Sequence, residues 1–191
     1  MLKTIEENFI SVDFTLGKLI FIARENSSDF LFYKDNFKKS ENFAEVFLEF
    51  INKNNINLDE NKNILINLGP GSFIGLRNIL SSLKALRLLK KLKFFGFNNF
   101  QIFGQFLKKK KLKKIGIKIN NKYFCIPFNK YKRFKIKPTV QKKIATSKDT
   151  FIFDKNFFED KKKPYYGLSE INYILKNKIY IKGNIDPLYY S

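Results

Sequence analysis

The chain has 191 residues, 44% of them hydrophobic and 17% aromatic, so it can bury a core as one large domain or two small lobes and is not a disordered chain. Its formal net charge is +20, which favours attraction to polyanions such as tRNA. It has no histidine and one cysteine, Cys125, which excludes histidine-based catalytic triads, histidine-ligated metals and an internal disulfide.

The first half of the chain alternates short apolar runs with helical patterns. Runs joined by short turns predict an antiparallel meander of three strands, at residues 9–14, 18–24 and 29–33. Ser40 is the expected N-cap of a helix over residues 40–53. The elements expected next are a strand at 64–68, a helix at 72–91, a strand at 93–97 and a helix at 100–107. This order predicts an α/β fold whose mixed sheet is covered by helices, with parallel strands after the first helix.

The second half of the chain has mostly short predicted strands and one short helix. A lysine run, KKKKLKK at residues 108–114, predicts a solvated hinge between two lobes, 1–107 and a shortened 108–191. Contact of these lysines with nucleic-acid phosphates is the alternative. The elements expected beyond it are strands at 115–119, 123–128, 131–136, 151–153 and 179–182 and a helix at 169–176. The apolar stretches are far shorter than the roughly 20 residues that cross a bilayer. Because the N-terminal segment carries Glu6 and Glu7 and no long apolar core, we expect that it is not a signal peptide and that the protein is cytoplasmic without membrane contact.

The most informative segment is LGPGSFIGLR at residues 68–77. It lacks the Gly-Lys-Ser/Thr of a phosphate loop. Its glycines are spaced one residue too widely for a dinucleotide fingerprint, and it follows the fourth strand instead of the first. Glycines that permit close backbone approach, followed by the N-cap Ser72, favour a structural strand-to-helix turn with a tightly packed helix start.

The same segment closely resembles the G-P-G-S-F-T-G-L-R signature of the TsaB family, once called YeaZ. The matching residues are Gly69, Pro70, Gly71, Ser72, Phe73, Gly75, Leu76 and Arg77. Weaker matches are Asp13 with Thr15, the Lys39-Ser40-Glu41 segment, Gly96 with Phe97, and Pro187-Leu188-Tyr189. The resemblance covers residues 9–107 well and fades beyond them, where residues 119–124 lack the Arg and Glu of a family segment.

This resemblance implies the actin-like ATPase (ribonuclease H-like) fold, with a complete N-terminal lobe and a reduced C-terminal one. It implies a non-catalytic subunit that supports a TsaD-type transferase. That enzyme carries threonylcarbamoyl onto the adenosine next to the anticodon of tRNAs reading codons that begin with A. The resemblance also implies that a TsaE-type ATPase joins the assembly and that this chain contacts tRNA through the complex. ATP or ADP is expected to bind to the complex and not to this chain alone. The resemblance implies no catalytic or metal-binding residue in this chain and leaves room for a homodimer.

In the family, the first two helices pack against the partner. Here they correspond to residues 40–53 and 72–91. A stripe of mostly small residues lies beside the Leu-rich face of the second helix and would admit a partner helix closely. The expected interface residues are Phe43, Phe47, Asn78, Ser81, Ser82, Ala85 and Leu89. A merely solvated stripe is the alternative.

Other interpretations remain open at this point. Asp13 lies where an actin-like fold has a metal–nucleotide acid, although a lone Asp at a strand end is more often a turn former, and a small actin-fold kinase or ATPase is the enzyme alternative. A peptidase is disfavoured because Ser72 has no histidine base. A general basic RNA-binding protein is the third class, but Arg-rich motifs are lacking. Lysine, asparagine, isoleucine and phenylalanine have AT-rich codons, so we favour compositional drift over a selected basic surface.

Overall fold

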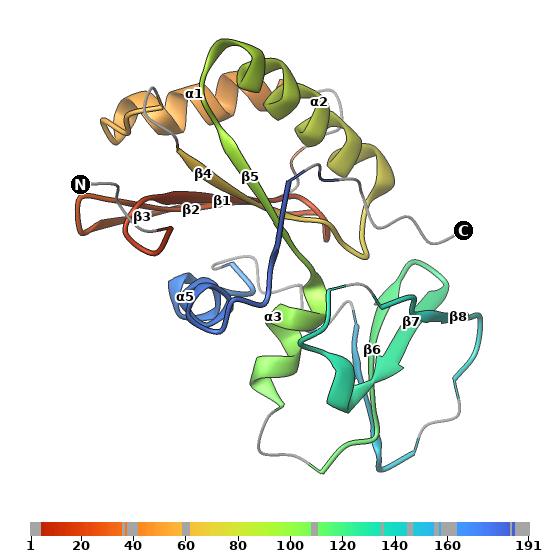
Figure 1. The fold of residues 1–191 in the computed structure, drawn as a ribbon. Helices are drawn as coiled ribbons and strands as arrows, with labels where there is room; N and C mark the ends of the chain where they lie inside the picture. The colour runs from red at the N-terminus through yellow and green to blue at the C-terminus, as the bar shows by residue number, and fades with distance from the viewer. Residues whose placement is uncertain are drawn as a thin grey trace.

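The computed structural model of the chain contains two β-sheets, with helices packed on both faces of the first one (Figure 1). It describes residues 5–35, 37, 42–58, 62–107, 111–134, 136–144, 147–154, 157, 164–183 and 185, with only the backbone of Phe73. Helices α1 and α2 cover one face of the first sheet, and α3 and α5 lie on its other side, towards the second sheet. Within these ranges no helix is both long and apolar enough to span a membrane.

The first sheet has six strands in the order β10-β5-β4-β1-β2-β3. Its strands are β1 (Phe9–Asp13), β2 (Leu19–Glu25), β3 (Ser28–Lys34), β4 (Asn63–Asn67), β5 (Lys93–Phe97) and β10 (Ile181–Lys182). The β1-β2-β3 meander is antiparallel, whereas β1-β4 and β4-β5 are parallel, which confirms both predictions. All residues of β1 and β4 are buried because helices cover both faces of these strands.

Helices α1 (Phe43–Lys53) and α2 (Phe73–Leu89) pack their apolar faces on this sheet. The Ser72 side chain accepts a hydrogen bond from the amide of Gly75 at 3.3 Å, as an N-cap should. The cap of α1, however, is Asn42, whose side chain accepts from the amide of Ala44 at 3.1 Å. Ser40 lies outside the described residues, and its prediction as the cap was wrong because an equally good capping residue follows two positions later.

The opposite face of the sheet carries α3 (Asn99–Phe106) and α5 (Leu168–Lys176). Helix α3 starts with a capping box, in which Asn98 and Gln101 each bind the other's backbone amide through their side chains. The apolar residues of both helices share one core with the inner faces of the two sheets. The two sheets are therefore joined by continuous packing.

The second sheet has four strands in the order β8-β7-β6-β9. They are β6 (Lys114–Ile119), β7 (Lys122–Pro127), β8 (Thr139–Gln141) and β9 (Thr150–Phe153). The strand predicted at 131–136 is wrong: a 3-10 turn, η1 (Phe128–Lys130), leads into turns there. Tyr131 instead packs on α3, where a Cβ on Gly104 would lie 2.2 Å from its ring. Helix packing thus outweighs the strand-like apolar alternation.

The end of the described chain returns to the first sheet. Strand β10 pairs antiparallel with β5, with Ile181 opposite Gly96. The boundary predicted after residue 107 separates the two sheets, but α5 and β10 lie beyond it and pack with the first sheet and α3. The second lobe as a compact unit is thus the four-stranded sheet with its connections.

Candidate functional site

The turn between β4 and α2 is built around glycines that touch the protein's own backbone. Gly69 has a φ of +98° and precedes a cis peptide bond to Pro70. A Cβ on Gly71 would lie 2.2 Å from the carbonyl oxygen of Thr15, and one on Gly75 would lie 2.3 Å from the Phe14 ring. Both distances are far inside van der Waals contact, so any side chain there would collide with the segment after β1.

Hydrogen bonds fix this turn from two sides. The amide of Ser72 donates to the carbonyl of Thr15 at 2.6 Å. From the other side, Asn99 donates its backbone amide to the carbonyl of Gly69 at 2.9 Å and its side-chain amide to that of Pro70 at 2.7 Å. The close approach that the glycines permit is therefore used within the chain, which favours the structural turn over a phosphate loop.

Asp13, at the carboxyl end of β1, is the centre of a buried polar network. Its Oδ1 accepts from the amide of Thr15 at 2.7 Å. Its Oδ2 accepts from Asn67 Nδ2 at 2.8 Å and from the hydroxyl of Tyr165 at 2.6 Å. The network continues from Asn67 Nδ2 to Asn99 Oδ1 at 2.7 Å and from Asn99 Nδ2 to Thr15 Oγ1 at 2.9 Å. It joins the ends of β1 and β4 to the start of α3 and to the segment before α5.

Burial dominates the electrostatics of this network. Asp13 has no exposed surface, and loss of hydration raises the pKa of its carboxyl, although the hydrogen bonds from Tyr165, Thr15 and Asn67 oppose that rise. Burial, followed by the nearby Asp13 charge, raises the pKa values of the Tyr165 and Tyr166 hydroxyls well above their ordinary value. Both phenols therefore stay protonated, and Tyr165 stays a donor to Asp13. Among the described residues, no cluster of three or more acidic, histidine or cysteine side chains could hold a metal ion.

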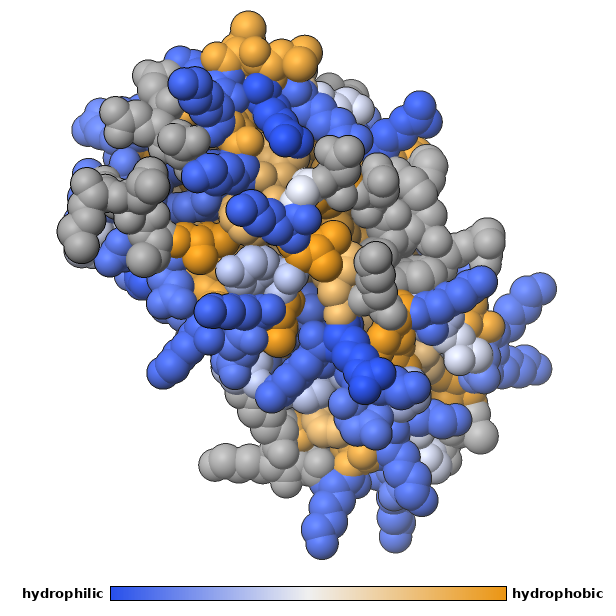
Figure 2. All heavy atoms as spheres, viewed as in Figure 1, coloured by the Kyte–Doolittle hydropathy of each residue, from blue (hydrophilic) through white to orange (hydrophobic). Residues whose placement is uncertain are grey.

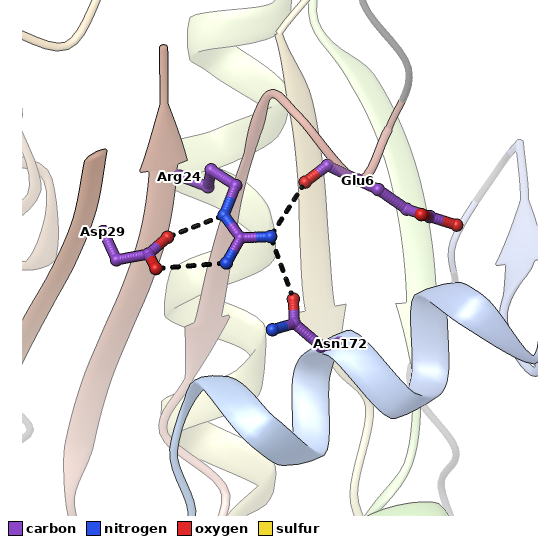
Figure 3. Close-up of polar contacts among 4 residues, drawn as sticks. All are labelled: Glu6, Arg24, Asp29 and Asn172. Atoms are coloured by element: carbon purple, nitrogen blue, oxygen red, sulfur yellow. Dashed lines mark hydrogen bonds and ion pairs between the residues drawn. The ribbon is translucent and has the colours of Figure 1, made fainter. Parts of the chain in front are cut away.

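Arg24 on β2 links the meander to α5 (Figure 3). Its guanidinium donates to both carboxylate oxygens of Asp29 at 2.7 and 3.1 Å. A third nitrogen, Nη1, donates to the carbonyl of Glu6 and to Asn172 Oδ1 on α5, each at 3.4 Å. The hydrogen bonds to Asp29 raise the pKa of the guanidinium further. This is a structural tie on the same side of the first sheet as Tyr165.

The interface residues expected on α2 and α1 fall into two groups. Asn78, Ser81, Ala85 and Leu89 are exposed and Ser82 is half-buried, and together they form a stripe along α2. Phe43 and Phe47 of α1 are instead 3% and 0% exposed. Their rings pack against Phe21 of β2. Their prediction as partner contacts is corrected, because helical spacing alone does not separate a core face from an interface edge.

The stripe on α2 ends in exposed leucines. Leu88 and Leu89 are 88% and 80% exposed, and Ile74 at the other end of the helix is 45% exposed. Figure 2 shows a hydrophobic protrusion at the top of the molecule, where Figure 1 places the end of α2. Arg77 of the motif is also exposed on this helix, and no described residue forms an ion pair with it. Adjacent leucines this exposed form an apolar patch on the surface.

Three residues of the buried network were missed by the sequence reasoning. Asn67 is the last residue of β4 and Asn99 follows β5 by two positions. A polar residue at the end of each parallel strand is a signal that could have placed them together, since these ends meet at one edge of the sheet. Tyr165 is contributed from 152 residues away, and no local pattern points to it.

The fold matches known structures, although no family model and no curated protein matches the chain. YeaZ from Pseudomonas aeruginosa aligns over 91% of this chain and 96% of its own, with a TM-score of 0.60 and 11% identity. A protein from the same organism, described as uncharacterized with similarity to peptidase YEAZ, aligns over 96% of this chain and 99% of its own, with a TM-score of 0.65 and 10% identity. The chain is therefore YeaZ-like, or TsaB-like, in fold over nearly its whole length.

Proposed function

We propose that this chain is a TsaB-type interaction subunit on an actin-like fold, which binds and supports a TsaD-type transferase in the threonylcarbamoylation of tRNA. The observation that carries the proposal is the exposed stripe on α2. Its apolar ends, Ile74 and the Leu88–Leu89 pair, flank the small residues Ser81 and Ala85. Small side chains allow two helices to approach closely, and flanking leucines supply the apolar area that stabilises such a contact.

The motif supports this surface indirectly. Because Gly71 and Gly75 dock against residues 14–15, the start of α2 is held in a fixed position on the first sheet. The apolar side of α2, with Ile79 and Leu83 at most 1% exposed, packs on the core. The helix therefore presents its opposite side rigidly to a partner, which reduces the entropy lost on binding.

The proposal is tested by size-exclusion chromatography with light scattering of this chain mixed with the TsaD-type transferase of the same organism. We expect a heterodimer at micromolar concentrations. Ala85→Arg and Leu89→Glu should each abolish it, because they place a charge in the proposed contact. Leu31→Glu is the matched control: it also changes an exposed residue, 55% exposed on β3, and should leave the heterodimer intact.

Two results would contradict the proposal. One is separate elution of the two proteins with and without nucleotide. The other is equal loss of the complex in Leu31→Glu and Leu89→Glu, which would mean that α2 has no special part.

A second experiment adds a TsaE-type ATPase and tRNA to the mixture, because the proposal also expects modified tRNA to form only when this chain is present.

A further inference from the structure

The positive charge of the chain is concentrated in the second sheet and its connections. Residues 108–154 contain 16 of the 37 basic residues and only two of the 17 acidic ones, a net charge of +14. Residues 1–107 contain 14 basic and 11 acidic residues, a net charge of +3. Drift towards AT-rich codons would add lysine throughout the chain without removing acids from one part. The segregation is not expected from drift alone, and it favours a selected basic surface over the interpretation that the composition suggested.

This charge lies on the surface. Every described lysine and arginine between residues 111 and 154 is exposed. Lys113 forms an ion pair with Asp149 at 2.7 Å, and both side chains are solvent-exposed, so this pair neutralises little of the total charge. Figure 2 shows hydrophilic side chains projecting from the lower part of the molecule, where Figure 1 places β6, β7 and β8.

The strand register separates the two faces of this sheet. Ile115 and Ile117 of β6, with their partners Ile126 and Phe124, point into the core shared with α3. Side chains alternate along a strand, so Lys114 and Lys118 point to the outer face.

One row of the outer face crosses three strands. Lys118 pairs with Tyr123 of β7, which in turn pairs with Gln141 of β8. The Lys118 ammonium lies 5.4 Å from the centre of the Tyr123 ring. Lys118 and Gln141 are exposed and Tyr123 is half-buried. The row thus presents a cation, a ring and an amide side by side.

We propose that this outer face binds RNA, with Lys114 and Lys118 on backbone phosphates and Tyr123 stacked on an unpaired base. Lysines attract phosphates regardless of sequence, and a tyrosine on an open sheet is a stacking platform for a single-stranded base. A membrane is the less favoured polyanion, because surface-binding proteins insert apolar side chains. The strongly exposed apolar residues of the described chain, from Leu31 to Phe157, all lie outside β6–β8. The inference does not depend on the transferase partnership.

The test uses the full chain alone and the fluorescence anisotropy of two labelled RNAs, a tRNA transcript and an unstructured oligouridine, titrated over a range of KCl concentrations. The first variant is Lys114→Gln with Lys118→Gln. Its matched control is Lys53→Gln with Lys93→Gln, which removes the same charge from exposed positions of the first lobe. The site variant should lower the slope of log affinity against log salt by about 1.4 to 1.8, the release expected from two lost phosphate contacts. The control should leave it nearly unchanged.

A second variant separates stacking from charge. Tyr123→Leu keeps the charge and the apolar contact area, so it should weaken oligouridine binding about fivefold or more with an unchanged salt slope. Far-UV circular dichroism checks that each variant is folded. Equal losses in the site and control pairs, or no binding of either RNA, would overturn the proposal. So would binding to vesicles containing phosphatidylserine in the absence of RNA binding, which would identify a membrane surface.

Discussion

Gly71→Ala tests whether the 69–77 motif serves the fold or a ligand. The new methyl group would lie 2.2 Å from the carbonyl oxygen of Thr15 and 2.4 Å from its Cβ. Because the nearest atom belongs to the backbone, no side-chain rotation can relieve the contact. The 2.6 Å hydrogen bond from the Ser72 amide to the same carbonyl would have to lengthen or break as the two segments move apart.

The expected cost combines two terms. Forcing an extra carbon into a packed interior costs about 1–3 kcal/mol, and loss of one buried backbone hydrogen bond adds about 1 kcal/mol. We expect a total of about 3 kcal/mol, which lowers Tm by roughly 6–12 °C in a chain of this size. Gly167→Ala is the control: its Cβ would meet only a flexible carboxylate oxygen of Glu170 at 3.9 Å, so its cost should stay at about 1 kcal/mol or below, set by replacing Gly with Ala at the N-cap of α5.

The assay is urea unfolding followed by far-UV circular dichroism, with the transferase complex measured in parallel. If Gly71→Ala is as stable as the parent, the self-packing explanation of the motif is refuted. If such a stable variant also loses the complex, Gly71 would instead serve close approach to a partner or ligand. A large loss of stability, with binding retained at low temperature, supports the structural explanation.

Three further predictions concern the polar contacts and the leucines. Tyr165→Phe removes the donor to the buried Asp13 carboxylate and should cost about 1.5–3 kcal/mol by urea unfolding, whereas Asp29→Ala, which breaks a solvent-exposed pair with Arg24, should cost less than about 1 kcal/mol. Burial raises the pKa of folded Asp13, so the folded protein keeps this proton to a higher pH than the unfolded chain does. The contribution of Asp13 to the free energy of unfolding is therefore fully present below the ordinary carboxyl range and is lost as pH rises through the raised pKa. The parent should therefore lose stability relative to Asp13→Asn over that rise in pH; an opposite trend would mean that the hydrogen bonds outweigh burial. Leu88→Ala with Leu89→Ala should leave the unfolding midpoint within about 0.5 kcal/mol of the parent while weakening the complex; unchanged binding would remove these leucines from the interface.

Much of the first half was predictable because local patterns and packing agree there. The 64–68 strand, the capping Ser72 and the leucine spacing of α2 all correspond to observed elements. The second half was harder, since its strands are short and its apolar residues pack on α3. Tyr131 shows why: the apolar alternation that resembles a strand instead fills the space left by Gly104, and that neighbour lies 27 residues earlier in the chain.

The candidate site also contains residues that the sequence could predict and residues that it could not. The motif residues at 69–77 were identifiable by resemblance, and the need for glycine at 71 and 75 follows from the structure. Only part of the buried network could be predicted. Asp13 could be identified because it ends a predicted strand, but no sequence pattern pointed to its partner Tyr165. Phe43 and Phe47 were misassigned because an interface face and a core face share the helical period.

The edge at which parallel sheets ordinarily bind ligands is closed here by the chain itself. At the ends of β1, β4 and β5, Asp13, Asn67 and Asn99 satisfy one another, and Tyr165 donates to Asp13. A ligand could reach the fully buried Asp13 only after breaking that contact. Binding sites are therefore expected on the outer surfaces of α2 and of the second sheet instead of at this edge.

Those two surfaces should act independently. Figure 1 places the C-terminal end of α2 and the second sheet at opposite ends of the molecule, and changes at sites so far apart add without coupling. Leu89→Glu should therefore abolish the transferase complex without changing RNA affinity, and the Lys114→Gln, Lys118→Gln pair should weaken RNA binding without changing the complex. Measuring both variants in both assays separates the two surfaces. If either variant impairs both activities, the separation fails, because a single shared surface or a conformational link between the sheets would then be required.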